Sequence, residues 1–408
     1  MPESAACRVC GGEVVEFMDF GKQPISDCFL PPESTTPEHF FRLVVGACDS
    51  CTMVQLLHEV PRERMFHDHY PYHSSGSARM REHFRAVAER FVGTELTGDD
   101  AFIVELGCND GVMLATVAEA GIRHLGVEPS GSVADVTAAR GIRVRKDFFE
   151  EETARAIRAD DGQAAVIYAA NTLCHIPYMG SVLRGVHELL APDGVFVFED
   201  PYFADIVRQT SFDQMYDEHF YYFTARSVAE MARRHGLDLV DVERLTVHGG
   251  EVRYTLARAG ARERTATVGE LLAEEAAAEL TARHTLEGFR DRVLKARDDL
   301  TSLLRELRAQ GKDIVGYGAT AKSATVLNYC GIGPESIAYV TDTTPAKQGR
   351  LTPGSHIPVV PHQRFADDRP PYAVLFAWNH AEEIMAKEQE FRDAGGRWIR
   401  YVPEVRVD

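Results

Sequence analysis

The chain has 408 residues, a formal net charge of −18, 45% hydrophobic residues and 26% charged residues. A chain of this length is too long to fold around one ordinary hydrophobic core, so we expect two or three domains. The composition is that of a globular protein. The negative charge would repel a phosphate backbone, and the chain has no run rich in Lys and Arg, which argues against nucleic acid as a partner.

The first residues, MPESAACRVC, have neither the basic region nor the apolar stretch of a signal peptide, and nowhere do 18 consecutive apolar residues occur. We therefore expect a cytoplasmic protein with no membrane partner. In that reducing compartment, cysteines are more often free or metal-bound than bridged.

Two C-x-x-C pairs stand near the N-terminus, Cys7 with Cys10 and Cys48 with Cys51. Each pair forms a tight turn with two thiolates, and together they predict a tetrahedral site for a structural Zn²⁺, since four Cys ligands leave no position for a substrate. The alternative is two separate redox pairs, but these need a thioredoxin-like βαβ context that the sequence does not show.

From about Phe102, short apolar runs alternate with amphipathic stretches, which predicts a doubly wound parallel α/β sheet. Its expected strands are AFIVELG, RHLGVEP, IRVRKDFF, AAVIYAANTLCH and GVFVFEDP. The turn after the first strand reads ELGCNDG, residues 105–111, and Glu128 ends the second strand. Glycines let the backbone approach a ligand, and an acid at that strand end can hold ribose hydroxyls. On the glycines alone, an NAD-type site and a plain αβ turn remain alternatives.

With Asp147 and Phe148 after the third strand, the pattern resembles the class I S-adenosylmethionine (SAM) methyltransferase domain. The resemblance implies that the glycine turn lies under the amino acid part of SAM, that Glu128 holds the ribose and that Asp147 faces the adenine. Asn109 replaces the usual middle glycine, and Asn tolerates a positive φ better than most residues. The residues expected at SAM are Glu105, Gly107, Asn109, Asp110, Glu128, Asp147, Phe148 and Asn171.

The segment SFDQMYDEHFYYF, residues 211–223, follows the fifth strand and carries Tyr216, Glu218 and His219 among aromatic side chains. Ligands of doubly wound sheets lie at the carboxyl ends of the strands, so this segment and the loop with His175 reach the same crevice. A carbon acceptor must lose a proton before it takes a methyl group, and a histidine can remove that proton if a donor holds the enolate oxygen. Spacing leaves both histidines as candidates for the base, and a buried His219–Glu218 pair without chemistry is the alternative.

A helical stretch over residues 268–310 leads to a second Rossmann-like unit that begins DIVGYGATAKSATVLNY. Its turn lacks the Walker A spacing, but a helix N-terminus with Lys322 and Ser323 can bind a diphosphate. The alternatives are a structural unit with no ligand and an NAD-dependent oxidoreductase, although the third glycine of that fingerprint is absent.

As a whole, the chain resembles the sugar C-methyltransferases of antibiotic biosynthesis. The resemblance is carried by CRVCGG with CDSC, HDHYPYHSSGSARMREHF, VELGCNDGVML, AANTLCHIPY, FDQMYDEHFYYF, VHGGEVRYTLAR, VGYGATAKSATVLN and FAWNHAEEIMAKE. It implies a monomer that methylates C-3 of a dTDP-linked 4-keto-deoxysugar, such as dTDP-3-amino-2,3,6-trideoxy-4-keto-glucose. The implied parts are a zinc-binding domain over residues 1–75, a SAM domain over 76–265, and a connecting helix with a Rossmann-like domain over 266–408 that helps to bind the nucleotide.

The resemblance makes His219 the base and puts other residues of the matching motifs near the sugar nucleotide. The residues implied at the reacting sugar are Tyr70, His175, Tyr216, Glu218 and His219, and those implied in substrate binding are Tyr72, Lys322, Ser323 and Asn328. Two other functions stay open at this point: an O- or N-methyltransferase on a small natural product, and a zinc-ribbon binding protein with an inactive enzyme domain.

Overall fold

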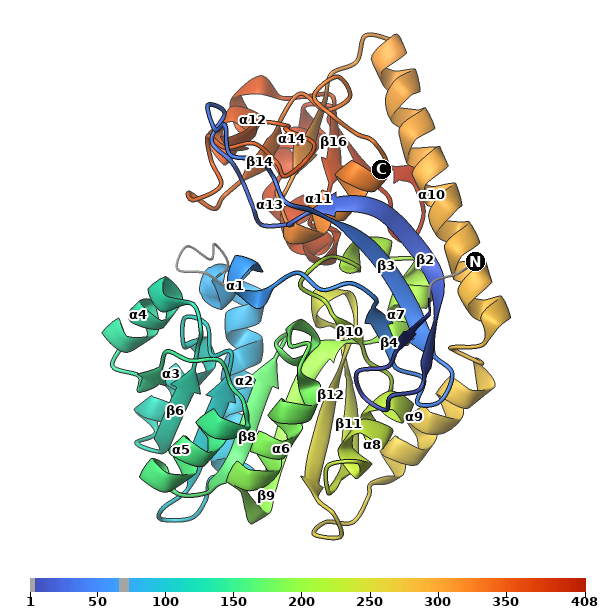
Figure 1. Ribbon diagram of the computed structural model, residues 1–408. Helices are drawn as coiled ribbons and strands as arrows, with labels where there is room; N and C mark the ends of the chain where they lie inside the picture. Colours follow the sequence, from blue (N-terminus) through green and yellow to red (C-terminus); the bar gives the residue numbers. More distant parts are fainter. Residues whose placement is uncertain (1–3, 66–72) are drawn as a thin grey trace.

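The computed structural model describes residues 4–65 and 73–408, so the predicted site residues Tyr70 and Tyr72 lie outside the described residues. Within the described chain the strands form three β-sheets. Figure 1 shows the C-terminal sheet with its helices above the central sheet, and the N-terminal strands beside both.

The N-terminal sheet is antiparallel and has the order β1-β2-β3-β4-β10. Its strands are β1 (Ser4–Ala6), β2 (Glu13–Pro24), β3 (Phe40–Cys48), β4 (Val54–Leu56) and β10 (Tyr221–Tyr222), and the short helix α1 (Arg62–Met65) follows β4. The fifth strand comes from the segment in which we expected the catalytic residues, and its Tyr221 pairs with Gln55. That segment is therefore built into the N-terminal sheet, which the sequence analysis did not foresee.

The central sheet has seven strands in the order β11-β12-β9-β8-β5-β6-β7. They are β5 (Phe102–Leu106), β6 (Arg123–Val127), β7 (Val144–Arg145), β8 (Ala164–Ala170), β9 (Leu190–Pro201), β11 (Leu237–Leu245) and β12 (Glu251–Arg258). The first five are parallel, and β12 pairs antiparallel with both β9 and β11. Hydrophobic residues on both faces of the central strands β5, β8 and β9 are buried, as strands covered by helices on both sides require. The predicted doubly wound fold is confirmed.

Helices cover this sheet and connect its strands (Figure 1). They are α2 (Ala78–Thr94), α3 (Val112–Glu119), α4 (Gly131–Ala139), α5 (Glu151–Asp161), α6 (Met179–Leu189), α7 (Phe203–Gln209) and α8 (Ala225–Arg233). Short 3-10 turns occur at η1 (Ser74–Gly76), η2 (Leu173–His175), η3 (Phe212–Gln214) and η4 (Val247–Gly249).

The C-terminal sheet has the order β15-β14-β13-β16-β17-β18, and all its pairs are parallel except the last. Its strands are β13 (Ile314–Tyr317), β14 (Val340–Asp342), β15 (Val359–Pro361), β16 (Tyr372–Leu375), β17 (Arg397–Arg400) and β18 (Arg406–Val407). Its helices are α11 (Ala321–Tyr329), α12 (His362–Asp368), α13 (Ala381–Lys387) and α14 (Gln389–Asp393), with a 3-10 turn η5 (Trp378–His380). The expected second Rossmann-like unit is confirmed.

The helical stretch expected over residues 268–310 is two helices, α9 (Ala266–Ala277) and α10 (Arg283–Ala309). They are separated where Glu279 takes a left-handed conformation with a φ of 45°. No Gly or Pro marks this break, so the helical pattern of the sequence runs across it. α10 contacts both β2 and β13 and passes along the outside of the molecule (Figure 1). Its buried leucines include Leu300, Leu304 and Leu307.

The N-terminal and C-terminal sheets are docked to each other by polar contacts. Lys347 Nζ lies 3.0 Å from Asp27 Oδ1, and both side chains are about nine-tenths buried. His356 Nε2 lies 2.6 Å from Glu38 Oε2. Of the helices in the described part of the chain, none has the length and apolar character needed to cross a membrane.

A buried glutamate on α9 joins this helix to the central sheet. Glu275 Oε1 accepts hydrogen bonds from the Tyr202 hydroxyl at 3.0 Å and from the Ala225 backbone N–H at 2.6 Å. Its Oε2 accepts from the Arg226 backbone N–H at 3.0 Å. The two N–H groups belong to the first two residues of α8, and such groups have no acceptor within the helix. The helix dipole also favours a negative charge at this end.

We predict that Glu275→Ala lowers the free energy of unfolding by roughly 2–4 kcal/mol, because it leaves a buried hydroxyl and two helix N–H groups without an acceptor. Urea unfolding followed by circular dichroism measures the change. The neighbouring Glu274 is exposed, so Glu274→Ala is the matched control and should change the free energy by less than about 0.5 kcal/mol. Equal effects of the two substitutions would contradict the role of Glu275.

Candidate active site

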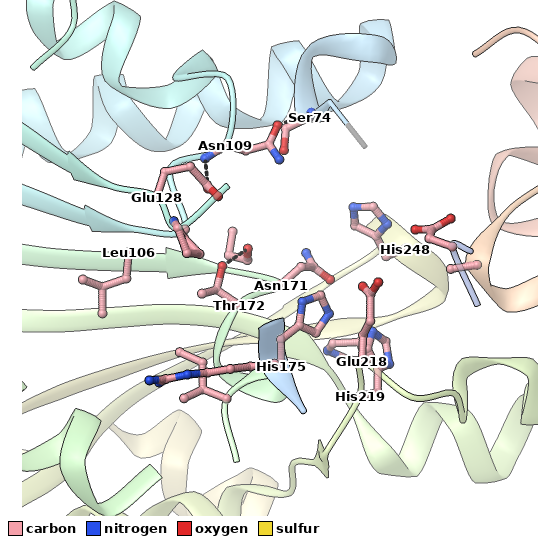
Figure 2. Close-up of a pocket in the computed structure, with 18 of the residues that line it drawn as sticks. Ser74, Leu106, Asn109, Glu128, Asn171, Thr172, His175, Glu218, His219 and His248 are labelled. Carbon is pink, nitrogen blue, oxygen red and sulfur yellow. Dashed lines mark hydrogen bonds between the residues drawn. The ribbon is translucent and has the colours of Figure 1, made fainter. Parts of the chain in front are cut away.

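A cavity lies at the carboxyl ends of β5, β6, β8 and β9, where a doubly wound sheet binds its ligands. It encloses about 1560 Å³, including the space open to solvent. Asp27 and Arg62 from the N-terminal part, and Thr320 to Lys322 with His380 from the C-terminal part, contribute to its wall. Figure 2 shows Glu128 and Asn109 at one end, His175, Glu218 and His219 at the other, and Asn171 and Thr172 between them.

The first end of the cavity is formed by the glycine turn after β5. The Asn109 backbone N–H donates to Glu128 Oε2 at 3.0 Å, and the Ser130 N–H donates to Oε1 at 2.9 Å. Asn109 has a φ of 49°, so this residue does adopt the left-handed conformation that the usual glycine would take. Its side-chain oxygen accepts from the backbone N–H groups of Ser74 and Asp110, which fixes the turn to the segment before α2.

Next to this turn, Asp147 and Phe148 line the cavity together with Arg62 of α1. The Arg62 guanidinium lies over the Phe148 and Tyr178 rings, 4.2 and 4.6 Å from their centroids, and its Nη1 is 2.8 Å from Glu150 Oε1. The sequence analysis missed Arg62, because a four-residue helix carries no periodicity that would assign it to a site.

Two of the residues expected at SAM are buried but do not line the cavity. Asp110 interacts instead with the Ser75 hydroxyl and with Arg140, whose Nη2 is 3.4 Å from Oδ2. Glu105 is 4% exposed, and burial raises its pKa well above the usual value, helped by the charges of Asp110 and Glu128. Gly107 and Asn171 do line the cavity.

The second end of the cavity holds Tyr216, Glu218, His219 and His175, all from the predicted cluster. The Tyr216 hydroxyl is 2.8 Å from His219 Nε2, and the two rings are 4.2 Å apart. The rings of His175 and His219 are 5.2 Å apart. Tyr216, Glu218 and His219 are less than 8% exposed, so the cluster is largely shielded from solvent.

Burial keeps both imidazoles neutral. It lowers the pKa of His175 to about 4 and takes the pKa of His219 well below the usual 6.5. For His219, the electrostatic effects of the neighbouring His175 and Lys322 side chains also lower the pKa, and the Gln214 backbone raises it. Burial and the charge of Glu218 raise the pKa of the Tyr216 hydroxyl. The cluster therefore combines a neutral imidazole with a protonated phenol, which is a base next to a hydrogen-bond donor.

From the C-terminal part, Lys322 lines the cavity, whereas Ser323 and Asn328 do not. Lys322 Nζ is buried, has no hydrogen-bond partner among the described residues and lies 5.5 Å from the centre of the Trp378 ring. Thr320 caps the start of α11: its hydroxyl oxygen accepts from the Ser323 backbone N–H, and the Ser323 hydroxyl donates to the Thr320 carbonyl. Asn328 Nδ2 donates to the Ala324 and Pro353 carbonyls.

Two histidines that the sequence analysis did not single out also line the cavity, His248 and His380. Their rings are 6.3 Å apart, and His248 has a φ of 48° in the turn between β11 and β12. Both belong to motifs that carried the family resemblance, VHGGEV and FAWNH. The spacing of residues within these motifs does not indicate that the two histidines lie close to each other.

The four cysteines of the C-x-x-C pairs come together as predicted. Cys7 Sγ is 3.6 Å from Cys51 Sγ, Cys10 Sγ is 3.4 Å from Cys48 Sγ, and all four sulfur atoms lie within 4.8 Å of one another. Tetrahedral zinc with Zn–S bonds of about 2.3 Å separates its sulfur ligands by about 3.8 Å. The cluster fits a structural Zn²⁺, and it lies apart from the residues that line the cavity.

Three family models match successive parts of the chain: a zinc binding domain over residues 7–66, a methyltransferase domain over 77–242 and a C-methyltransferase C-terminal domain over 246–403. C-methyltransferase NovU of Streptomyces niveus is 36% identical over 404 residues, which cover 98% of this chain and 96% of NovU. A ubiquinone biosynthesis O-methyltransferase of Cupriavidus pinatubonensis is 29% identical over 171 residues, covering 38% of this chain and 68% of that protein.

Among solved structures, a SAM-dependent methyltransferase of Anabaena variabilis matches 43% of this chain and 84% of its own, with 17% identity and a TM-score of 0.35. The match to NovU extends over nearly the whole of both chains and includes all three parts in order. The chain belongs to the family of SAM-dependent C-methyltransferases that includes NovU and that joins a zinc-binding domain to a methyltransferase domain and a C-methyltransferase C-terminal domain.

Proposed function

We propose that this C-methyltransferase methylates C-3 of a dTDP-linked 4-keto-deoxysugar, with His219 as the base that removes the C-3 proton. The observation that carries the proposal is the buried His219–Tyr216 pair, with 2.8 Å between Nε2 and the hydroxyl, inside a cavity to which the C-terminal part adds a buried lysine. The proposed active form is a monomer, as the resemblance of the chain to the sugar C-methyltransferases implies.

SAM, when bound, supplies an electrophilic methyl group on a sulfonium. In the proposed arrangement the carboxylate of Glu128 accepts hydrogen bonds from the ribose hydroxyls. Two backbone N–H groups already donate to this carboxylate and hold it at the end of β6. Asp147 and Phe148 lie beside the adenine, and Gly107 with Asn109 lets the backbone approach the amino acid part. Asn171 lies between the two ends of the cavity, as Figure 2 shows.

Proton removal depends on which nitrogen of His219 carries the lone pair. We assign the proton of the neutral ring to Nδ1, so that Nε2 is the basic atom and accepts the Tyr216 hydroxyl, 2.8 Å away, in the free protein. When the sugar is bound, Nε2 takes the proton from C-3 and the electron pair moves to the C-4 oxygen. The Tyr216 hydroxyl, released from Nε2, donates to that oxygen.

Bound SAM would supply the methyl group to C-3 and keep the electron pair of the S–CH₃ bond on its sulfur, and His219 would return its proton to water. Glu218 and His175 line the same end of the cavity as His219. A carbon acceptor needs this deprotonation, whereas an oxygen or nitrogen acceptor brings its own lone pair.

The diphosphate of the sugar nucleotide is assigned to the start of α11. Thr320 and Lys322 both line the cavity there, and the helix N-terminus offers N–H groups and a positive dipole end. Lys322 Nζ provides a buried positive charge with no hydrogen-bond partner in the described residues. An anionic ligand would supply the partner that this group lacks.

The decisive test is mass spectrometry of the purified protein with SAM and dTDP-3-amino-2,3,6-trideoxy-4-keto-glucose, with a parallel reaction in deuterium oxide without SAM. We expect a methyl group on carbon, and deuterium at C-3 when SAM is omitted.

His219→Asn should retain SAM affinity and slow the exchange by at least about 100-fold. The control His235→Asn alters a histidine that does not line the cavity and should exchange normally. A methyl group on nitrogen would refute the proposed acceptor, and normal exchange in His219→Asn would refute the proposed base.

Glu128→Gln should raise the dissociation constant for SAM at least about tenfold, because a charge-assisted hydrogen bond is worth roughly 1.5–3 kcal/mol. Isothermal titration calorimetry measures the constant. Glu119 is exposed at the end of α3, so Glu119→Gln is the control and should bind SAM as the unmodified protein does. Unchanged affinity in Glu128→Gln would remove this residue from the proposed cofactor site.

The pH dependence of kcat/KM should reflect the low pKa of His219. Because that pKa lies well below 6.5, the neutral basic form persists as the pH falls through 6.5, where an ordinary histidine is half protonated. We expect no loss of kcat/KM at pH 6.5 and a decline only at lower pH. A decline with its midpoint at 6.5 or above would show that His219 is not the titrating base.

A further inference from the structure

Most of the residues that carry the proposed chemistry lie in one buried loop. We call residues 211–219 the YDEH loop, after its last four residues. Every residue from 211 to 225 is buried. A loop normally runs over the surface, where water satisfies its polar groups, so a buried loop must find these partners elsewhere in the protein.

The first half of the YDEH loop is bound by the C-terminal part. Asp213 Oδ2 accepts hydrogen bonds from the Trp378 indole Nε1 at 2.6 Å and from the Tyr401 hydroxyl at 2.7 Å. The Thr325 hydroxyl donates to the Met215 carbonyl at 2.8 Å. These donors lie in η5, after β17 and in α11, so three separate elements of the C-terminal part converge on this half of the loop.

The second half of the loop is bound by the N-terminal part. The Ser26 backbone N–H donates to Asp217 Oδ1 at 3.1 Å. Directly after the loop, the Phe220 carbonyl accepts from the Leu56 N–H at 3.0 Å, and β10 then pairs with β4.

The Asp213 carboxyl is fully buried, and burial raises its pKa. Positive charge at Lys322 and the hydroxyl and indole donors favour the charged form and offset part of this effect. A carboxylate at such a depth is tolerated only with these partners. The donors therefore fix where η3 lies.

η3 is connected directly to the proposed base. Gln214 follows Asp213 and lines the cavity, and Tyr216, two residues further on, has its hydroxyl 2.8 Å from His219 Nε2. The backbone also closes over the intervening residues, since the His219 N–H donates to the Tyr216 carbonyl at 3.1 Å. A shift of η3 therefore moves Tyr216, which contacts the proposed base through both its hydroxyl and its carbonyl.

We propose that Asp213 is a positioning residue that couples the C-terminal part to catalysis: Trp378 and Tyr401 hold its carboxylate, and through η3 they hold His219 in the orientation for proton removal. The C-terminal part would thus orient the base as well as bind substrate. This inference rests on the proposed role of His219.

The test is Tyr401→Phe, which removes one hydroxyl and keeps the ring. Tyr401 does not line the cavity. We expect C-3 deuterium exchange and kcat to fall about threefold to tenfold, with KM for SAM unchanged. The double variant Tyr401→Phe/Trp378→Phe should lose more than about tenfold. The ring resonances of His219, assigned by comparison with His219→Asn, should shift in nuclear magnetic resonance spectra of Tyr401→Phe without any substrate present.

The matched control is Tyr317→Phe in the same C-terminal sheet. The Tyr317 hydroxyl also donates to a buried carboxylate, Glu388 Oε1, at 2.8 Å, but it makes no contact with the YDEH loop that would transmit the change. This variant should lose stability yet keep the exchange rate and the His219 resonances. Equal losses in the two variants, or an unshifted His219 resonance in Tyr401→Phe, would overturn the inference. The His219 resonance could shift in Tyr401→Phe while the unmodified protein shows no C-3 exchange. That result would refute the proposed function but would still support the coupling of the C-terminal part to His219.

Discussion

Burial of a loop dense in titratable groups is the constraint on which the rest of the architecture depends. Asp213, Asp217, Glu218 and His219 lie within seven residues, and each is at most 4% exposed. A buried polar group without a partner costs roughly 1–3 kcal/mol, and an unpaired charge costs more. One sheet cannot surround the loop on all sides, so the partners come from the N-terminal and C-terminal parts. The three parts are therefore held together by the same contacts that offset the cost of burying the loop.

The sequence predicted the features that depend on local patterns. Alternating apolar runs located the five parallel strands of the central sheet, because strands buried on both faces need continuous apolar residues. The two C-x-x-C pairs located the zinc ligands, since the tight turns fix two sulfur atoms each. The strand ends also located part of the cavity wall, including Gly107, Glu128 and Asn171, because the carboxyl ends of parallel strands meet at one edge.

Contacts between distant residues left no such pattern. Nothing in YYF indicates that Tyr221 pairs with Gln55, and nothing in FAWNH indicates that Trp378 donates to Asp213, 165 positions earlier. The break at Glu279 was missed because it has no Gly or Pro to mark it. Motif position alone also did not separate Asn109, which lines the cavity, from its neighbour Asp110, whose carboxylate turns to Arg140 instead.

A net charge of −18 opposes the approach of an anionic sugar nucleotide, so binding must rely on local charge. In the proposed site Lys322 provides it, and the same charge adds to the larger effect of burial in lowering the pKa of His219. In the proposed complex the diphosphate would offset part of the positive charge of Lys322. The basicity of His219 would then rise at the moment when a C-3 proton is available to remove. Asp213 limits this response, because the carboxylate favours the charged form of Lys322 in the free protein as well. In the proposed complex, the strength of the base would therefore depend on occupation of the nucleotide site.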